Sequence, residues 1–324
     1  MDLNQHLLTI AIPTYNRHNK LLRLLDILKD EILRLHISDV VRIIISDNSD
    51  NTITENAISN FNHEIIDLQF YKQKENIGFD RNLLFLYQQC ISKYIWFISD
   101  DDCPLPDSLS KILSALQTNE PDILLFSFMQ PPGSTARQFD FKEDVRVIQE
   151  PRLLINTVLK YPKISIYVLK KVDFTESQHE FLIKSIGQGW IFLTISFSVL
   201  EMNKNSTIAI ISEQLATADD DYKYIWVPTP FLHMHKIAFH PYIVKYIPEL
   251  HKKLKIDGYI QCIIFSWALK RRILLLDDME GLNNFIKKLN WRFPILLTRP
   301  KLFFQFFLMK FNLIPPFLIL KPLE

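Results

Sequence analysis

Short aliphatic runs alternate with amphipathic stretches along the first 130 residues of the chain. The runs, rich in β-branched residues, predict strands at residues 7–12, 40–46, 68–71, 94–98 and 123–128. The stretches between them predict helices at residues 20–35, 80–90 and 107–116, the first with Leu21, Leu24, Leu25 and Leu28 at helical spacing. This alternation is typical of βαβ units, so we expect an α/β fold with a parallel central sheet.

The alternation ends near residue 130. Residues 131–138, PPGSTARQ, combine Pro and Gly and predict a loop or a boundary. Beyond them we expect mainly helix from about residue 150 to 200, a strand at 207–211, and helix again up to a Phe-rich end.

The composition argues against a nucleic-acid-binding protein and for a reducing compartment. With 48% hydrophobic residues, 23% charged residues and a net charge of +1, the chain has no global field that would draw it to nucleic acid. Cys90, Cys103 and Cys262 lack disulfide or zinc-ligand spacing, which favours a reducing compartment. The first apolar run has no basic region before it and predicts a strand rather than a signal peptide, so we expect a cytoplasmic protein.

Four polar clusters follow four consecutive predicted strands, at residues 13–17 (PTYNR), 47–51 (DNSDN), 76–82 (NIGFDRN) and 99–102 (SDDD). Ligands of open parallel sheets bind beyond the carboxyl ends of the strands, which is where these clusters lie. Each cluster alone also fits a strand-to-helix turn with a capping residue. Their order and spacing favour one shared binding site.

Three adjacent carboxylates, Asp100, Asp101 and Asp102, follow the apolar run YIWFI. Their mutual repulsion favours a bound cation, and hard cations such as Mg²⁺ or Mn²⁺ prefer oxygen ligands and bridge to substrate phosphates. The alternative is a solvated acidic turn that caps the next helix. The buried strand before the carboxylates favours a metal site that a diphosphate completes.

The motifs IPTYNR, IISDNSDN, ENIGFDRN and FISDDD, in this order, resemble the nucleotide-binding half of a family 2 glycosyltransferase. The resemblance covers roughly residues 7–130 and implies the GT-A fold, an α/β architecture, with a mainly helical C-terminal extension. It divides the chain into a nucleotide-sugar-binding half (residues 1–130), an acceptor-side half (131–240) and a helical, Phe-rich region (241–324).

The resemblance also implies roles for individual residues. The base and diphosphate pocket would be lined by Pro13, Thr14, Tyr15 and Arg17, with Asp47 bonding a pyrimidine and Ser49 beside it. The nucleotide and donor sugar would be bordered by Asn76, Gly78, Asp80, Arg81, Asn82 and Asp101. On their own, Gly78 also fits a turn and Arg81 a solvated helix position. The metal-binding acid pair would be Asp100 and Asp102, the latter catalytic.

The family's usual catalytic base has no counterpart here. Where relatives carry a Glu-Asp pair, residues 185–190 read SIGQGW, and neither Gln188 nor Trp190 accepts a proton at neutral pH. Among the nearby acidic residues and His179 we favour Glu180 as the base, although residues 175–178 also fit helix capping. Trp190 is a candidate for stacking on an acceptor sugar, or a core residue.

Histidines and a second acidic triplet follow the predicted acceptor-side helices. In some relatives a C-terminal His completes the metal site, and of His233, His235 and His240 we favour His235 for that role. A surface or hydrogen-bonded His is the alternative for each. Residues 219–221, DDD, lack a preceding apolar strand and predict a solvated loop.

The Phe-rich end interleaves cations with short apolar runs that prolines interrupt. Its cations are Arg292, Arg299, Lys301, Lys310 and Lys321. The runs are too short to span a bilayer, so we expect the segment to lie on the cytoplasmic face of the inner membrane, or else to pack on the catalytic domain.

The resemblance implies an inverting transferase that moves a sugar from a nucleoside-diphosphate sugar to a polyprenyl-diphosphate-linked saccharide in bacterial surface-polysaccharide or O-antigen synthesis. ENIGFDRN and the GQGW segment are similar to transferases of dideoxyhexoses, the abequosyltransferases among them. Two other classes remain open. A metal-dependent nucleotidyltransferase would use the same carboxylates, and an inactive nucleotide- or sugar-binding module would need no base.

Overall fold

The computed structural model describes residues 6–129, 141–160, 162–187, 190–218, 237 and 239–250. The chain divides into two compact units, Met1–Tyr222 and Lys223–Glu324, and each is described by itself. The first unit contains all of the predicted strands. Within the described residues no helix is long and apolar enough to cross a membrane.

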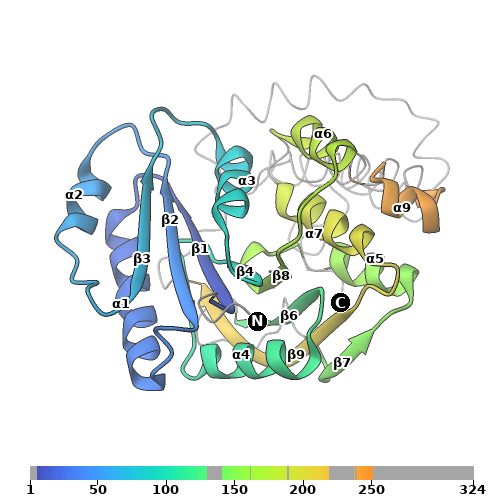
Figure 1. Cartoon of the computed structure of the whole chain (residues 1–324), viewed down its shortest axis with the longest axis horizontal. Helices are drawn as coiled ribbons and strands as arrows, with labels where there is room; N and C mark the ends of the chain where they lie inside the picture. The colour runs from blue at the N-terminus through green and yellow to red at the C-terminus, as the bar shows by residue number, and fades with distance from the viewer. Residues whose placement is uncertain are drawn as a thin grey trace, which may run out of the picture. The chain divides into compact units, whose positions relative to one another are not determined.

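The described strands of the first unit form one mixed sheet of nine strands in the order β3-β2-β1-β4-β8-β6-β9-β5, with β7 paired to β9 (Figure 1). The strands β3, β2, β1 and β4 are parallel to one another, and β6 is parallel to β9. The strand β8 is antiparallel to both of its neighbours, β4 and β6. The sheet is therefore a parallel half joined to a mixed half through β8.

The five strands predicted in the first 130 residues are all present. They are β1 (Leu8–Thr14), β2 (Val41–Asp47), β3 (Asp67–Lys72), β4 (Tyr94–Phe97) and β6 (Ile123–Met129). The three predicted helices are confirmed as α1 (His18–Leu35), α3 (Phe79–Gln89) and α4 (Ser108–Asn119). Two short elements were not predicted, α2 (Ile53–Ser59) and β5 (Asp102–Pro104).

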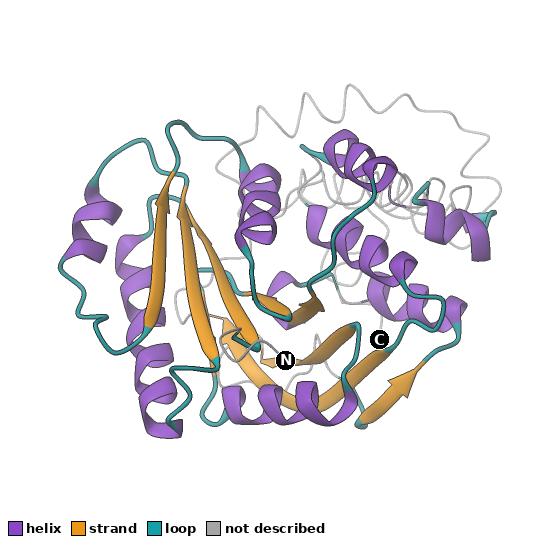
Figure 2. Cartoon of the chain, viewed as in Figure 1, coloured by secondary structure: helices purple, strands orange, loops and turns teal. Residues whose placement is uncertain are grey.

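Helices cover both faces of the sheet (Figures 1 and 2). The helix α1 buries Leu21, Leu24, Leu25 and Leu28, the four leucines whose spacing predicted it, and packs against α4. It ends at His36, whose left-handed backbone returns its N–H to the carbonyls of Ile32 and Leu33. On the other face α3 packs on β1 and β2 and contacts α7.

Residues 151–202 are mainly helical, as predicted, but one strand, Tyr167–Lys170, interrupts the helices, and another, Val145–Ile148, precedes them. Its elements are β7 (Val145–Ile148), α5 (Pro151–Lys160), the 3₁₀ turn η1 (Ile164–Ile166), β8 (Tyr167–Lys170), α6 (Glu176–Ser185) and α7 (Ile191–Met202). The strand predicted at 207–211 is β9 (Ile208–Ala218), which is longer because it continues past β6 to pair with β5.

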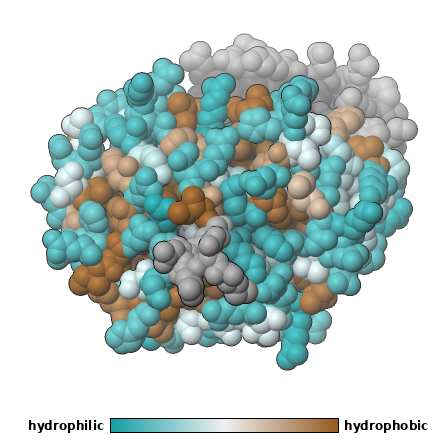
Figure 3. Space-filling view, viewed as in Figure 1, coloured by the Kyte–Doolittle hydropathy of each residue, from teal (hydrophilic) through white to brown (hydrophobic). Residues whose placement is uncertain are grey.

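The helix α7 is buried on all sides from Ile191 to Leu200, and this position explains its uniformly apolar sequence. The helix α6 begins with a capping box, because Thr175 and Gln178 each bond the other's backbone N–H. The surface in Figure 3 shows hydrophobic side chains in small patches between hydrophilic ones. The side chains of Cys90 and Cys103 are buried.

In the second unit the structure describes the helix α9 (Pro241–Tyr246). His240 caps it by accepting the backbone N–H of Tyr242 at Nδ1, 3.2 Å away, and burial lowers the pKa of this imidazole to about 3. Several predicted features lie outside the described residues. They are the loop at 131–138, the triplet at 219–221, Gln188, His233, His235, Cys262 and the Phe-rich end.

Candidate active site

The pocket of interest lies where β1 and β4 end, at the point where the strand order reverses direction. The hydroxyl of Thr14, the last residue of β1, donates to Oδ2 of Asp100, just beyond β4, over 2.7 Å. The pocket has a volume of about 520 Å³. It is lined by Pro13, Thr14, Tyr15, Arg17, Asn48, Asn76, Gly78, Phe79, Asn82, Ser99, Asp100 and Asp101.

Three of the four polar clusters supply most of this lining, and the second supplies Asn48. Of the residues predicted to bind the nucleotide sugar, the structure brings nine into it: Pro13, Thr14, Tyr15, Arg17, Asn76, Gly78, Asn82, Asp100 and Asp101. Four others lie outside the described lining, namely Asp47, Ser49, Asp80 and Arg81.

Asp47 and Ser49 join the ends of β1 and β2 beneath the pocket. Asp47 is fully buried, and its carboxylate accepts the hydroxyl and the N–H of Ser49 and the ammonium of Lys72, the last at 3.0 Å. The Ser49 hydroxyl in turn accepts the N–H of Asn16 over 2.8 Å. All of these bonds stay within the protein. The predicted contact of Asp47 with a pyrimidine stays a prediction.

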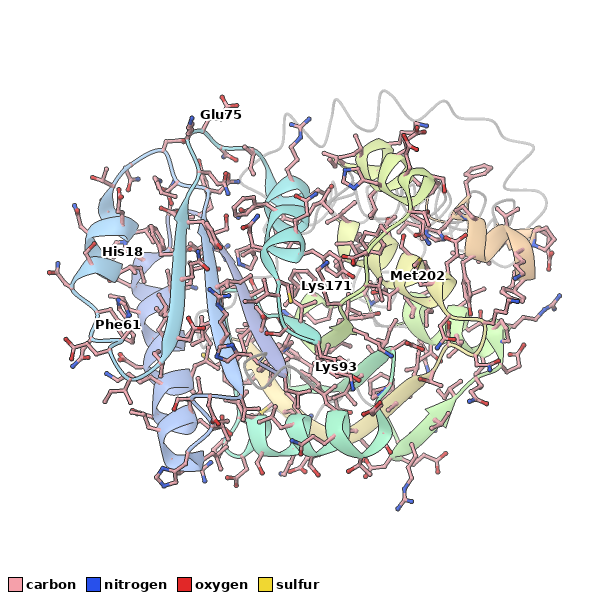
Figure 4. The ribbon with its side chains drawn as sticks, viewed as in Figure 1. His18, Phe61, Glu75, Lys93, Lys171 and Met202 are labelled. Carbon is pink, nitrogen blue, oxygen red and sulfur yellow. The ribbon has the colours of Figure 1, made fainter. Side chains whose placement is uncertain are left out.

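The loop between β3 and α3, which Glu75 marks in Figure 4, is tied to the end of β2 by paired amides. The Nδ2 group of Asn48 donates to Oδ1 of Asn76 over 2.8 Å, and Oδ1 of Asn48 accepts the N–H of Ile77 over 2.9 Å. Gly78 follows with φ +80°, a left-handed conformation that favours glycine. This turn fixes where α3 begins at the pocket edge.

Two aromatic side chains at the pocket are unusually exposed. Tyr15, after β1, and Phe79, the first residue of α3, each leave 44% of their surface to solvent. Nearby, buried Asn82 donates from Nδ2 to the carbonyl of Ser46 over 3.0 Å, while its Oδ1 has no hydrogen-bond partner among the described groups. The pocket therefore offers aromatic faces and an amide beside its charged floor. Arg81 is exposed at the surface of α3.

Asp80 connects α3 to the start of α7. This buried carboxylate accepts the backbone N–H of Ile191, the first residue of α7, over 3.3 Å. It thereby caps a helix more than 100 residues away, next to half-buried Trp190. Asp80 therefore positions the first turn of α7, directly after residues 185–190.

The floor of the pocket carries paired opposite charges. One nitrogen of Arg17, Nη1, donates to Oδ1 of Asp100 at 2.9 Å and to Oδ2 of Asp101 at 2.7 Å. Burial raises the pKa of Asp100 to about 6, against the opposing effects of Arg17 and Thr14. Burial also opposes ionisation of Asp101, but the Ser99 hydroxyl, Arg17 and Lys163 outweigh it and lower that pKa.

Asp102 is held from the other side, by the segment before β8. Its side chain is 1% exposed, and both of its oxygens face Lys163 Nζ, at 3.0 and 2.8 Å. The Ser165 hydroxyl also donates to Oδ2 of Asp102 and accepts the N–H of Ser99 at 3.1 Å. Burial raises the pKa of Asp102, against the opposing charge of Lys163. Asp102 lies outside the described lining of the pocket.

The carboxylate oxygens at the floor of the pocket are ligands that fit a hard divalent cation, with substrate phosphates as further ligands. No group of three His, Cys, Asp or Glu side chains within the described ranges forms a metal site by itself. Asp100 and Asp101, however, converge on one cationic nitrogen of Arg17. A divalent cation bound through one or two carboxylates takes its remaining ligands from water and substrate phosphates. These two carboxylates are thus suited to such a cation.

The predicted base and acceptor residues lie elsewhere. Glu180 is exposed on α6 and pairs with Lys184 at 3.1 Å, outside the described lining. Trp190 is half-buried immediately before α7. The catalytic role of Glu180 and the acceptor role of Trp190 stay predictions.

Comparison with known proteins decides the family. The sequence model of Glycosyl transferase family 2 matches residues 9–171, from the start of β1 to just beyond β8. The match includes every element that contributes to the pocket. The chain belongs to glycosyltransferase family 2. The predicted family and enzyme class are therefore confirmed.

Two curated relatives of this family 2 glycosyltransferase bear glycosyltransferase names. An uncharacterized glycosyltransferase of Methanocaldococcus jannaschii, MJ1057, is 23% identical over 229 residues, which are 66% of this chain and 77% of the relative. Abequosyltransferase RfbV of Salmonella typhimurium is 35% identical over 124 residues, 37% of this chain and 35% of RfbV.

Solved structures share the fold. The crystal structure of S. aureus TarS superposes with a TM-score of 0.60 at 13% identity and covers 92% of this chain, which spans only 52% of the TarS chain. Its residues 1–349 in complex with UDP give a TM-score of 0.55 with 88% of each chain covered. At this identity the likeness shows the fold alone, and the predicted GT-A fold is confirmed.

Sequence reasoning missed several residues in and around the candidate site. Asn48, Phe79 and Ser99 stand inside the polar clusters, and the clusters themselves were the signal that pointed to them. Lys163 and Ser165 lie more than 60 residues beyond the acidic triplet, in a segment with no motif. Only the antiparallel insertion of β8 beside β4 brings them to Asp102.

Proposed function

We propose that this glycosyltransferase moves a sugar from a nucleoside-diphosphate sugar to a saccharide acceptor, with inversion at the anomeric carbon. The observation that carries the proposal is the pocket at the ends of β1 and β4. It combines a guanidinium, two carboxylates and two exposed aromatic rings within about 520 Å³. A nucleotide sugar presents the matching groups, namely a planar base, a diphosphate and hydroxyls.

In this proposal the nucleobase packs on Tyr15 and the diphosphate lies near Arg17. The guanidinium, 45% exposed, pairs with phosphate oxygens by charge-assisted hydrogen bonds. Asn76, Gly78 and Asn82 border the ribose and the sugar, and Gly78 permits a close backbone approach. The TarS complexes with UDP and UDP-GlcNAc, on the same fold, support a nucleotide-sugar donor.

The proposed cofactor is Mg²⁺ or Mn²⁺, held by Asp100 and Asp101 or Asp102 together with the donor diphosphate. When bound, the cation supplies positive charge that stabilises the departing nucleoside diphosphate. Arg17 contributes further positive charge to the same leaving group. His235 remains a predicted additional ligand.

Transfer then requires the acceptor hydroxyl to attack the anomeric carbon from the face opposite the departing diphosphate. The hydroxyl gives up its proton to a general base, for which Glu180 remains the predicted residue. Asp80 fixes the first turn of α7 and so orients the neighbouring Trp190 on the acceptor side. Trp190 is the proposed platform for the acceptor sugar.

The proposed acceptor is a saccharide carried on a polyprenyl diphosphate at the cytoplasmic face of the inner membrane. The cationic and aromatic pattern of residues 291–321 supports contact with anionic lipid. The similarity to abequosyltransferase RfbV supports a dideoxyhexose donor and a role in O-antigen synthesis. Flotation of the full chain with vesicles of phosphatidylglycerol, and its absence with phosphatidylcholine alone, would support the membrane contact.

Donor turnover tests the proposal directly. The full chain is incubated with UDP-, GDP-, CDP- and dTDP-sugars, or with nucleoside triphosphates, with and without Mn²⁺. Ligand binding and the release of nucleoside diphosphate and pyrophosphate are measured. Release of one nucleoside diphosphate without pyrophosphate, abolished by Asp100→Asn, is the expected result. Pyrophosphate release from nucleoside triphosphates would instead favour a nucleotidyltransferase. Binding without turnover, even with lipid-linked acceptors, would favour an inactive binding module.

A further inference from the structure

We propose that Lys163 is an internal counter-cation for Asp102 that competes with the divalent cation and so sets the metal affinity of the site. The inference rests on the proposed function, because it assumes that Asp102 belongs to the metal-binding acidic loop. It concerns a residue outside the four polar clusters. Lys163 lies between α5 and β8, in the turn just before η1.

The geometry gives Lys163 the position of a bound cation. Its ammonium lies 3.0 Å from Oδ1 and 2.8 Å from Oδ2 of Asp102, so it spans the whole carboxylate. The Ser165 hydroxyl takes a further position on Oδ2. Both oxygens of Asp102 are therefore engaged, and a divalent ion that takes both of them displaces the ammonium.

The ammonium is itself held in place. It lies 4.5 Å from the centre of the Phe128 ring, a cation–π contact, and the Lys163 side chain is only 16% exposed. Asp102 is 1% exposed. Removal of one partner from a buried ion pair strongly destabilises the folded protein. The pair of Lys163 and Asp102 therefore keeps the acidic loop folded when no metal is bound.

This arrangement links metal binding to the acidic loop as a whole. The Ser165 hydroxyl contacts both Asp102 and the N–H of Ser99, and Ser99 lines the pocket. Exchange of the ammonium of Lys163 for a divalent cation is therefore coupled, through Ser165, to Ser99 in the lining of the pocket. The released ammonium remains beside the site as a second positive charge.

The experiment measures the thermal stability of the full chain with MnCl₂ alone, without donor or acceptor. Lys163→Met keeps the length of the side chain and removes its charge. We expect it to unfold at a lower temperature than the wild type without metal, and to gain more stability from Mn²⁺. The apparent Kd for Mn²⁺ should fall about tenfold, because the competing cation is gone.

Two variants make the test specific. Lys171→Met is the matched control, because Lys171, labelled in Figure 4, also contacts an aromatic ring (Tyr87, 4.9 Å) and an aspartate (Asp173, 3.5 Å) but lies away from the triplet. It should leave the Mn²⁺ response unchanged. In the double variant Asp102→Asn/Lys163→Met the gain in Mn²⁺ affinity should vanish.

The proposal is overturned if Lys163→Met binds Mn²⁺ no more tightly than the wild type, or if the gain persists in the double variant. Sugar transfer is measured separately. A gain in Mn²⁺ affinity without any transfer would contradict the proposed function and leave the role of Lys163 standing. Sugar transfer without a gain in Mn²⁺ affinity would contradict the role of Lys163 and leave the proposed function standing.

Discussion

At the scale of single residues, the site is a set of buried charges that neutralise one another. Arg17 compensates Asp100 and Asp101, Lys163 compensates Asp102, and Lys72 compensates Asp47. Each of these carboxylates is at least partly withdrawn from water, which makes an unpaired charge costly. In the proposed function, a donor diphosphate and its cation would enter a site whose charges are already matched, so that binding would exchange one set of charge partners for another.

Arg17 is the cation most available to that exchange, because it is 45% exposed and lines the pocket. Arg17→Met should weaken binding of the cognate nucleoside diphosphate by about 10- to 100-fold, the loss of a hydrogen bond to a charged group. Isothermal titration measures the effect. Arg17→Lys keeps the positive charge but lacks the planar guanidinium, and it should recover part of the lost affinity for the nucleoside diphosphate. Equal affinity in Arg17→Met and the wild type would remove Arg17 from the donor site.

Phe79 tests whether the exposed aromatic edge of the pocket contacts the donor. Phe79→Ala should raise the Kd of the nucleotide sugar by about fivefold, roughly 1 kcal/mol of lost aromatic contact. Ile91→Ala is the matched control, since Ile91 is also an exposed apolar side chain, 54% exposed, just beyond the other end of α3. If both variants change the Kd alike, Phe79 has no specific contact with the donor.

The sequence predicted residue identities at the pocket better than their contacts. The strand-end clusters predicted one shared site, because the carboxyl ends of parallel strands converge, and the family resemblance that these clusters carry predicted nine of its lining residues. The inward direction of the Asp47 carboxylate was not predictable. It depends on Lys72, which reaches it from the neighbouring strand.

At the scale of secondary structure, capping side chains from distant elements fix the helices around the site. Glu31 on α1 accepts the N–H of Leu109 in the first turn of α4 over 3.1 Å. Asp80 on α3 does the same for α7. In each case the residue at the N-cap, Asp107 or Trp190, makes no such side-chain bond itself. These bonds join helices that the sequence pattern treats separately.

Glu31 predicts a specific pH dependence of stability. Burial raises its pKa above the ordinary value of 4.5, against the Leu109 N–H, Arg34 and Lys111, while nearby Asp107 adds to the rise. A carboxyl with a raised folded-state pKa contributes stability that is present below pH 4.5 and is lost as pH rises through the raised value. Glu31→Gln keeps the hydrogen-bond acceptor without the charge.

The difference in unfolding free energy between Glu31→Gln and the wild type should therefore shift in favour of the variant as pH rises from about 4.5 to 8. Urea unfolding at a series of pH values measures it. A difference that stays constant across this range would show that Glu31 has the same pKa in the folded and unfolded chains.

Loss of the Asp80 side chain should affect both the stability of the protein and sugar transfer, and a second cap variant separates the two effects. Asp80→Ala and Thr175→Ala each remove a helix cap and should each cost about 1 kcal/mol of stability. Thr175 caps α6, whereas Asp80 caps α7 beside Trp190. Asp80→Ala alone should also raise the KM for the acceptor. Equal acceptor kinetics in the two variants would contradict a positioning role for Asp80.

Local pattern predicted β1, β2, β3, β4 and β6 and three helices but missed β8, as it missed the short strands β5 and β7. The four residues of β8, YVLK, are too short for a period to be recognised, and flanking helical stretches dominate the window. The strand is stabilised by pairing with both β4 and β6, a tertiary effect. The missed strand β8 brings Lys163 and Ser165 to the acidic loop.

At the scale of the whole molecule, the candidate pocket lies at the ends of β1 and β4, on the parallel half of the sheet, and β8 joins this half to a mixed half. The parallel half follows from the alternation in the sequence. The mixed half does not, because β9 crosses from β6 to β5 through irregular pairing near Ser127. The family match to residues 9–171 spans the first half and the junction.

In the proposed function, the pocket at the ends of β1 and β4 binds a nucleoside diphosphate together with a divalent cation. Thermal unfolding of the full chain with UDP, GDP, CDP or dTDP, each with and without Mn²⁺, tests this claim. A ligand at 100 times its Kd stabilises the folded state by about 2.7 kcal/mol.

We predict that one nucleoside diphosphate raises the unfolding temperature, that Mn²⁺ increases the rise, and that Asp100→Asn removes the increase due to Mn²⁺. No rise with any of the four, from folded wild-type protein with Mn²⁺ present, would contradict the assignment of the pocket as the donor site.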